Sequence, residues 1–96
     1  MSQASFYKFR LYVAGDLLNS AQAGANLAAL CRTHLAGRHE IEVVDVFSEP
    51  MRALADAIFM TPTLVKLAPL PVRTIVGTLS QTLILMQALG LENDTV

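Results

Sequence analysis

The pattern of hydrophobic and polar residues predicts a strand followed by a helix at the start of the chain. Residues 6–14 are rich in aromatic and β-branched side chains, carry basic residues on one face and end at a glycine, which is typical of a strand. Apolar residues then recur at helical spacing as far as Leu35. We expect Asn19 to cap this helix, with Gln22 three residues later completing a capping box.

The next segments predict three more strands, with a short helix after the first of them. Residues 40–47 alternate acidic and apolar side chains at first, which indicates a second strand. Residues 50–59 begin with a proline, which suits the first turn of a helix. Two β-branched runs, 63–67 and 72–76, are joined by a proline-containing link and predict an antiparallel hairpin.

The last apolar segment is open to two interpretations. A capping box of Thr78 with Gln81 and a glycine stop at Gly90 predict a helix. The continuous run "TLILMQAL" at residues 82–89 also fits a buried strand, because periodicity does not separate the two. With the helix, the element order is βαβαββα, which is that of a thioredoxin-like α/β fold with helices on both faces of a mixed sheet.

Composition predicts one domain with its own core. The 96 residues are 53% hydrophobic and 16% charged. We expect the core of this domain to cover residues 6–91, followed by a short disordered tail at 92–96. Between Ala57 and Leu91 the only charged side chains belong to Lys66 and Arg73. This half of the chain therefore either lies mostly in the core or offers apolar surface to a partner chain.

Charge and hydropathy exclude several partners. The net charge is −1 and the chain has no basic run, so we expect no nucleic-acid binding. The longest apolar run is too short to span a membrane, and the first residues lack the pattern of a signal peptide. A single cysteine suits a reducing compartment, so we expect a cytoplasmic protein.

The sequence shows no combination of residues that predicts catalysis. A thioredoxin-like enzyme carries a reactive cysteine just after its first strand, but residues 14–20, "AGDLLNS", contain none. Cys31 lies among apolar helix positions and is predicted to be a core residue. His34 and His39 have no third ligand at a metal-like spacing, and no phosphate-binding loop motif is present. We therefore expect no enzyme activity, metal or cofactor.

Three prolines interrupt the hairpin segment, at Pro62, Pro69 and Pro71. Each removes a backbone donor, and each preceding peptide bond is open to the cis form at modest cost. Pro62 stands at the start of the third predicted strand, where thioredoxin folds hold a cis proline. The spacing suggests the hypothesis that the prolines allow this segment to adopt two alternative backbone conformations.

Several motifs resemble those of the KaiB family of circadian clock proteins. They are "LYVAG" at 11–15, "VVDV" at 43–46, "TPTLVK" at 61–66 and "PLPVRTIVGTLS" at 69–80. On these motifs the chain is identified as a member of that family, with a resemblance that runs from about residue 6 to residue 91.

The resemblance implies a non-enzymatic regulator. KaiB-family proteins bind the ring of the ATPase KaiC and, in that state, capture KaiA and displace a KaiB-like sensor kinase. The family also implies two folds: a thioredoxin-like monomer, and a form with a refolded C-terminal half that makes dimers and tetramers. Carried over to this chain, the partner-binding positions are Tyr7, Arg10, Lys66, Arg73 and Glu42. The positions that shape the two folds are Pro62, Pro69, Pro71, Gly77, Ala88 and Gly90.

The chain departs from the family pattern at positions that affect these expectations. Glu42 replaces a lysine on the strand whose edge meets KaiA, which puts KaiA binding in doubt, and we expect it to be a solvated edge residue. Ala88 replaces a glycine and Gly90 replaces an aspartate. Alanine favours a helix interior and glycine a helix end, so both changes favour the last helix and with it the thioredoxin-like form. Alternatives are a sensory domain of the sensor-kinase type, or a stress-related KaiB paralogue independent of KaiA.

Overall fold

The computed structural model describes residues 5–91, and the expected disordered tail at 92–96 lies outside them. The predicted order βαβαββα is confirmed, and the run "TLILMQAL" is helical in this structure. The elements are β1 (Tyr7–Val13), α1 (Leu18–His34), β2 (His39–Asp45), α2 (Pro50–Ala55), β3 (Thr63–Ala68), β4 (Arg73–Val76) and α3 (Thr82–Leu89).

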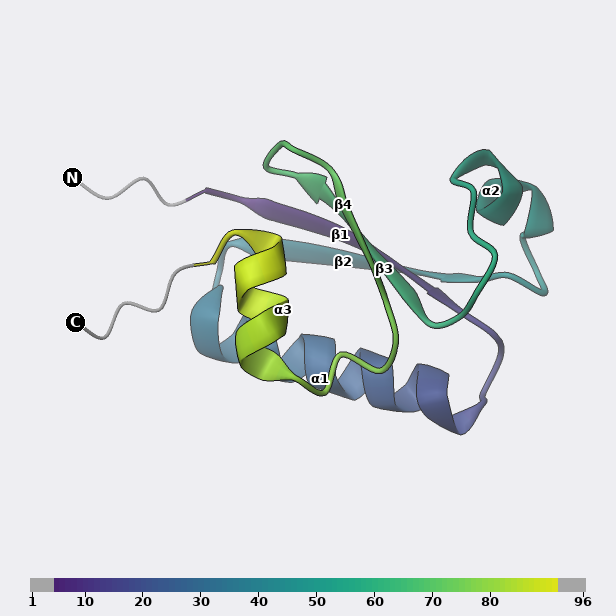
Figure 1. Ribbon diagram of the computed structural model, residues 1–96, viewed down its shortest axis with the longest axis horizontal. Coiled ribbons are helices and arrows are strands. Elements are labelled where there is room, and N and C mark those ends of the chain that lie inside the picture. Colours follow the sequence, from purple (N-terminus) through teal and green to yellow (C-terminus); the bar gives the residue numbers. More distant parts are fainter. Residues whose placement is uncertain (1–4, 92–96) are drawn as a thin grey trace.

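The four strands form one mixed sheet in the order β2-β1-β3-β4. β1 and β2 are parallel, as the crossover through α1 requires, whereas β3 runs antiparallel to both β1 and β4. The strands β2 and β4 therefore form the two edges. Figure 1 shows α1 and α3 on one side of the sheet and α2 at one end of it, away from α3.

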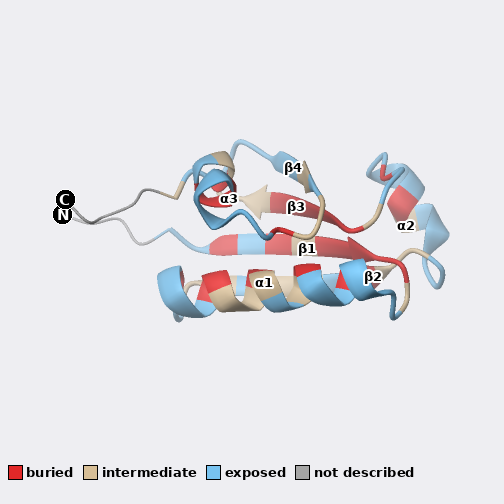
Figure 2. Cartoon of the chain, turned by 60° about the horizontal axis from the view of Figure 1, so that its bottom comes forward, coloured by how far each residue is buried: buried red, intermediate tan, exposed pale blue. Residues whose placement is uncertain are grey.

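Alternation along β1 builds a core on each face of the sheet. Tyr7, Phe9, Leu11 and Val13 pack with buried side chains of α1 and α3. Tyr12 faces the other way and packs with a smaller cluster that contains Val44, Ala53, Ile58 and Val65. Figure 2 shows the buried positions concentrated in β1 and β3 and along the inner sides of the helices.

Both predicted capping boxes are wrong. α1 begins at Leu18, so Asn19 already lies in its first turn, and no side chain caps it. The hydroxyl of Ser20 instead accepts a hydrogen bond from the Ala14 N–H at 3.0 Å. α3 begins only at Thr82, because Leu79 has a positive φ of 64°, outside the helical region; the Asn26 side-chain amide also donates to the Thr78 carbonyl at 2.8 Å.

The second helix is shorter than predicted. It ends at Ala55 rather than near Phe59. Ala57 adopts a positive φ of 57°, which breaks the helix, and the N–H of Ile58 turns back to the carbonyl of Ala53 at 2.8 Å. This turn buries Ile58 in the smaller core. Within residues 5–91, no helix has the length and apolar character that crossing a membrane requires.

Candidate interaction surface

The start of α1 carries no thiol at the position where thioredoxin-like enzymes hold one. Residues 14–20 are "AGDLLNS", and the chain has one cysteine. That residue, Cys31, is buried in the core as predicted. Burial raises the pKa of its thiol to about 11, which disfavours the reactive thiolate. The Cys31 thiol is therefore a core group held in its protonated form.

Charged side chains from three elements meet on the α2 face of the sheet. The parallel register of β1 and β2 places Arg10 opposite Glu42, and Arg10 Nε lies 3.0 Å from Glu42 Oε1. Arg10 Nη1 reaches Asp56 Oδ2, just beyond α2, at 3.0 Å. Arg52 of α2 pairs with the second oxygen of Glu42 at 2.8 Å. Glu42 lies on the edge strand β2 with 43% of its side chain exposed, as expected, but it is also paired with two arginines, which was not expected.

The hydroxyl of Tyr12 anchors this ionic network to the sheet. Tyr12 is fully buried, and its hydroxyl donates to Asp56 Oδ2 at 2.5 Å. The Tyr12 hydroxyl oxygen also lies 3.3 Å from the main-chain carbonyl oxygen of Arg52. Burial is the main cause that raises the pKa of Tyr12, which keeps the phenol a neutral donor. We call Arg10, Tyr12, Glu42, Arg52 and Asp56 the α2 network.

The network keeps both of its carboxylates ionised. Hydrogen bonds from Arg52 and then Arg10 lower the pKa of Glu42 to about 2. The hydrogen bond from Tyr12 is the main cause that lowers the pKa of Asp56, with Arg10 adding to it. A carboxylate with a lowered pKa in the folded state stabilises the fold above its unfolded pKa, and that stabilisation is lost as the pH falls through the folded value.

We expect the α2 network to make stability depend on acid pH. The free energy of unfolding should decline as the pH falls from the ordinary Glu42 pKa of 4.5 towards its folded value of about 2. Glu42→Gln should flatten this decline, because the glutamine does not titrate. Urea unfolding at a series of pH values measures it. Glu40→Gln, on the same strand, is the control, since Glu40 forms no ion pair within residues 5–91. If the free energy of unfolding declined equally with pH in wild type and Glu42→Gln, the pairing of Glu42 with the two arginines would be contradicted.

Apolar side chains are exposed around the same helix. Their exposed fractions run from 62% for Leu54 to 82% for Phe59. Figure 2 shows much of α2 and its flanking turns as exposed. Clustered exposed apolar groups beside polar ones mark sites of protein contact. We call the set the α2 surface: Phe47, Met51, Leu54, Phe59 and Met60.

The remaining residues predicted to bind partners lie on the opposite face of the sheet. Lys66 is 3% exposed, its Nζ donates to the carbonyl of Leu89 at 3.3 Å, and it lies 5.9 Å from the Tyr7 ring centroid. Burial, followed by the nearby charge of Arg73, lowers the pKa of Lys66. Tyr7 is buried too, whereas Arg73 is exposed. In this fold Tyr7 and Lys66 hold the end of α3, and a partner contacts them only if α3 moves.

The positions expected to shape the fold surround the β3–β4 hairpin and α3. The peptide bonds before Pro62, Pro69 and Pro71 are all cis. A cis bond was expected only before Pro62. Gly90 ends α3 with a φ of 80°, in the left-handed region that favours glycine, so the predicted helix stop is confirmed. Gly77, with a φ of 122°, follows β4, and Ala88 lies in α3.

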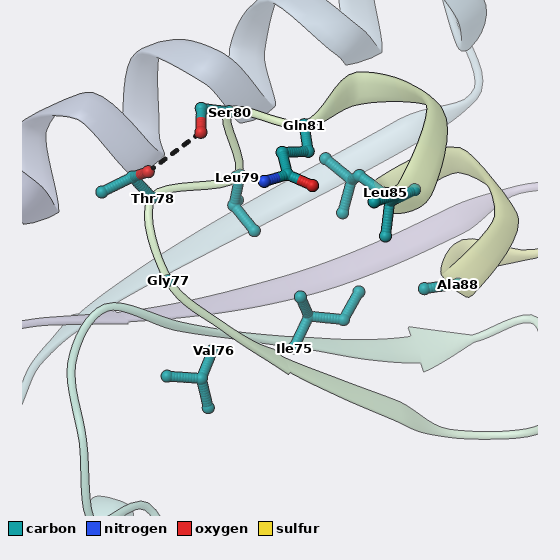
Figure 3. Close-up of a pocket in the computed structure, with 10 residues that line it drawn as sticks. Ile75, Val76, Gly77, Thr78, Leu79, Ser80, Gln81, Leu85 and Ala88 are labelled. Carbon is teal, nitrogen blue, oxygen red and sulfur yellow. Dashed lines mark hydrogen bonds between the residues drawn. The ribbon is translucent and has the colours of Figure 1, made fainter.

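A groove of about 290 Å³ lies between β4, residues 77–81 and α3 (Figure 3). Ile75, Leu85 and Ala88 form apolar walls, and none of its lining residues is charged. The hydroxyls of Thr78 and Ser80 lie 3.4 Å apart at its rim. Such a groove suits an apolar side chain rather than a charged ligand.

The fold places this chain in the class of thioredoxin-like domains. It is similar to the N-terminal domain of SasA from Synechococcus elongatus, with a TM-score of 0.74 at 20% identity over 100% of this chain and 93% of that one. It is also similar to mitochondrial thioredoxin 3 from Saccharomyces cerevisiae, with a TM-score of 0.71 at 16% identity over 91% and 80%. The predicted thioredoxin-like fold is thereby confirmed.

Sequence comparison narrows the class to one family. The KaiB domain model matches residues 10–91. The chain is 42% identical over 80 residues to the circadian clock oscillator protein KaiB of Synechococcus elongatus, covering 83% of this chain and 78% of that protein. It is 40% identical over 73 residues to the circadian clock protein KaiB3 of Synechocystis sp., covering 76% and 72%. The chain belongs to the KaiB family of clock-related proteins, as its motifs predicted.

Proposed function

We propose that this protein is a non-enzymatic clock or timer regulator, acting in the cytoplasm, that binds a KaiC-type ATPase ring and changes its phosphorylation or ATPase cycle. The observation that carries the proposal is the exposed α2 surface, held in place by the α2 network, in a chain of the KaiB family. The partner contacts this surface, and Arg10 and Glu42 act at its border.

The physical basis of the contact is a rigid apolar face with a charged rim. Met51 and Leu54 project from a helix that is fixed to the sheet by Tyr12, Arg10 and Glu42. Holding the contact residues in place before binding reduces the entropy lost on association. Bulky apolar anchors at the centre of such a face supply most of the affinity.

Met51→Lys tests this contact. We expect it to weaken binding to a cognate KaiC-type ATPase in ATP at least tenfold, about 1.4 kcal/mol, because an apolar anchor becomes a charge at the interface. Titration calorimetry or interferometry with phosphorylated and unphosphorylated rings measures the affinity. Leu83→Lys is the control, since Leu83 is exposed on α3, which lies away from α2 (Figure 1). Absence of wild-type binding to every form of the ring would overturn the proposal.

A second partner follows from the same role. KaiA would bind the regulator on the ring, and a KaiB-like sensor kinase would compete with the regulator for the ring. The charge of Glu42 is opposite to that of the family lysine, and Glu42 is committed to Arg10 and Arg52. We therefore propose weak or absent KaiA binding, as in a KaiA-independent, stress-related circuit.

Fold switching and self-association to a dimer or tetramer are part of the proposal. The segment 82–89 fits a helix or a strand by pattern, and its helix buries only Leu85, Met86 and Leu89. Release of α3 would uncover Tyr7 and Lys66, two of the predicted partner-binding residues. The prolines, Gly77, Ala88 and Gly90 all lie in the half that would refold.

A sensory domain of the sensor-kinase type is the second candidate. The similarity to the SasA N-terminal domain over the whole of this chain favours it. Identity of about 40% to KaiB proteins, against 20% to SasA, favours the regulator. A native reading frame that continues into a kinase would favour the sensory domain.

A further inference from the structure

Two exposed methionines lie in the α2 surface. Met51, in α2, is 74% exposed, and Met60, in the segment before β3, is 63% exposed. The other two sulfur-containing residues among residues 5–91, Cys31 and Met86, are buried in the larger core. An oxidant in solution therefore reaches the sulfur of this surface before any other sulfur that the structure describes.

The cysteine does not compete as an oxidation site. Cysteine reacts with oxidants as its thiolate. Burial raises the pKa of the Cys31 thiol to about 11, so the thiolate is scarce at neutral pH. A thioether has no proton to lose, and its reactivity follows its exposure. Met51 and Met60 are therefore the oxidation-sensitive groups within residues 5–91.

Both methionines are held in place without belonging to a core. Met51 and Leu54 are three residues apart and so lie on one side of α2, which the α2 network fixes to the sheet. The carbonyl of Met60 accepts a hydrogen bond from the Thr63 hydroxyl at 2.6 Å, which ties its backbone to β3. Neither methionine is a member of either buried cluster. We expect oxidation here to change the contact surface and to leave the fold intact.

We propose that Met51 and Met60 form a reversible oxidation site, at which a peroxide weakens the contact with the KaiC-type ring. This regulation rests on the function proposed above, because it acts through the same contact. A sulfur lone pair attacks one oxygen of hydrogen peroxide, a sulfur–oxygen bond forms and the oxygen–oxygen bond breaks. The second oxygen leaves as hydroxide and takes up the proton of the transferred oxygen, which gives water. The sulfur loses two electrons and the peroxide gains them.

The sulfoxide returns to the thioether through a dithiol-dependent reductase. Two thiols supply two electrons and two protons, the sulfoxide oxygen leaves as water, and the thiols join as a disulfide. Because both side chains are exposed, such an enzyme reaches them in the folded protein. The change at this surface is therefore reversible without unfolding.

Oxidation should weaken the ring contact about tenfold or more. The thioether is an apolar anchor, whereas the sulfoxide oxygen is polar and accepts hydrogen bonds. A partner surface that covers an apolar side chain offers no donor at that point, so the new acceptor is buried unpaired. The physical reason is the same as for Met51→Lys, but no charge is introduced.

The experiment treats the full chain with hydrogen peroxide, removes the peroxide with catalase, and then measures binding to an untreated ring in ATP. Mass spectrometry of peptides should show that Met51 and Met60 are oxidised before Met86. The affinity should fall about tenfold or more and should recover after treatment with methionine sulfoxide reductase and dithiothreitol. Circular dichroism should be the same before and after oxidation.

Matched variants assign the effect to these two sulfur atoms, and each protein is compared with its own untreated affinity. The Met51→Leu/Met60→Leu double variant has no thioether in the α2 surface, so peroxide treatment should leave its affinity unchanged. Met86→Leu is the control. It makes the same substitution in the core, where leucine fills a similar volume, and keeps both exposed thioethers. Oxidation should therefore weaken its binding as in wild type.

The oxidation site and the ring contact fail in different ways. If untreated wild type binds the ring and oxidised wild type binds it equally well, the oxidation site is overturned and the ring contact is not. The oxidation site is also overturned if the double variant loses as much affinity as wild type, or if oxidation unfolds the chain. If untreated wild type binds no form of the ring, both are overturned.

Discussion

Leu89→Ala should lower the free energy of unfolding by about 2–5 kcal/mol, because it removes a fully buried side chain and leaves a cavity. Leu89 is 0% exposed and packs at the end of α3 in the larger core. Its carbonyl also accepts the hydrogen bond from Lys66, and alanine retains that carbonyl. The change therefore isolates the packing of α3, and urea denaturation measures it.

Leu83→Ala is the matched control. It makes the same substitution in the same helix, but Leu83 is 67% exposed. A surface change of this kind should stay within about 0.5 kcal/mol. Equal losses for the two variants would contradict the docking of α3 through Leu89.

The same variant examines fold switching. Leu89→Ala destabilises the thioredoxin-like form, so the conformational equilibrium should shift towards any refolded, oligomeric form. Amide resonances would then show a second set of signals for the C-terminal half, stronger in Leu89→Ala than in wild type. A single set in both proteins at every concentration would leave fold switching without support.

Local pattern was enough to predict the order of the elements but not the state of α3 or the helix starts. The run at residues 82–89 is helical because Leu85, Met86 and Leu89 find a core to pack on, which no window of sequence contains. The capping predictions failed for a similar reason. Ser20 and Thr78 form hydrogen bonds with residues outside the turns that the patterns describe.

The candidate site was predictable only in part. The family resemblance singled out Arg10 and Glu42, but the network that joins them depends on Tyr12, Arg52 and Asp56, which sequence analysis missed. Arg10 and Glu42 are 32 positions apart and meet through the parallel register of β1 and β2. The one local signal was the spacing of four between Arg52 and Asp56, which places both on one side of a helical turn.

Tyr12→Phe should lower the free energy of unfolding by about 1.5–3 kcal/mol, because it removes a buried hydrogen bond to an ionised carboxylate. The Tyr12 hydroxyl donates to Asp56 and is the main cause of the lowered Asp56 pKa. The pKa of Asp56 should therefore rise towards its ordinary value, which carbon-detected NMR titration of the carboxyl group measures. The loss of stability that Asp56 contributes at acid pH should then be smaller than in wild type, because its folded and unfolded pKa values lie closer together.

Tyr7→Phe is the matched control on the other face of the same strand. Tyr7 is also buried, but its hydroxyl forms no side-chain hydrogen bond with residues 5–91, and phenylalanine keeps the ring beneath Lys66. Its free energy of unfolding should fall by less than that of Tyr12→Phe, because no hydrogen bond to an ionised carboxylate is lost. A loss from Tyr12→Phe no larger than that from Tyr7→Phe would contradict the α2 network as the anchor of α2. If the anchor holds, Tyr12→Phe should also weaken the KaiC-type contact, because a less firmly held α2 surface must be ordered at the moment of binding.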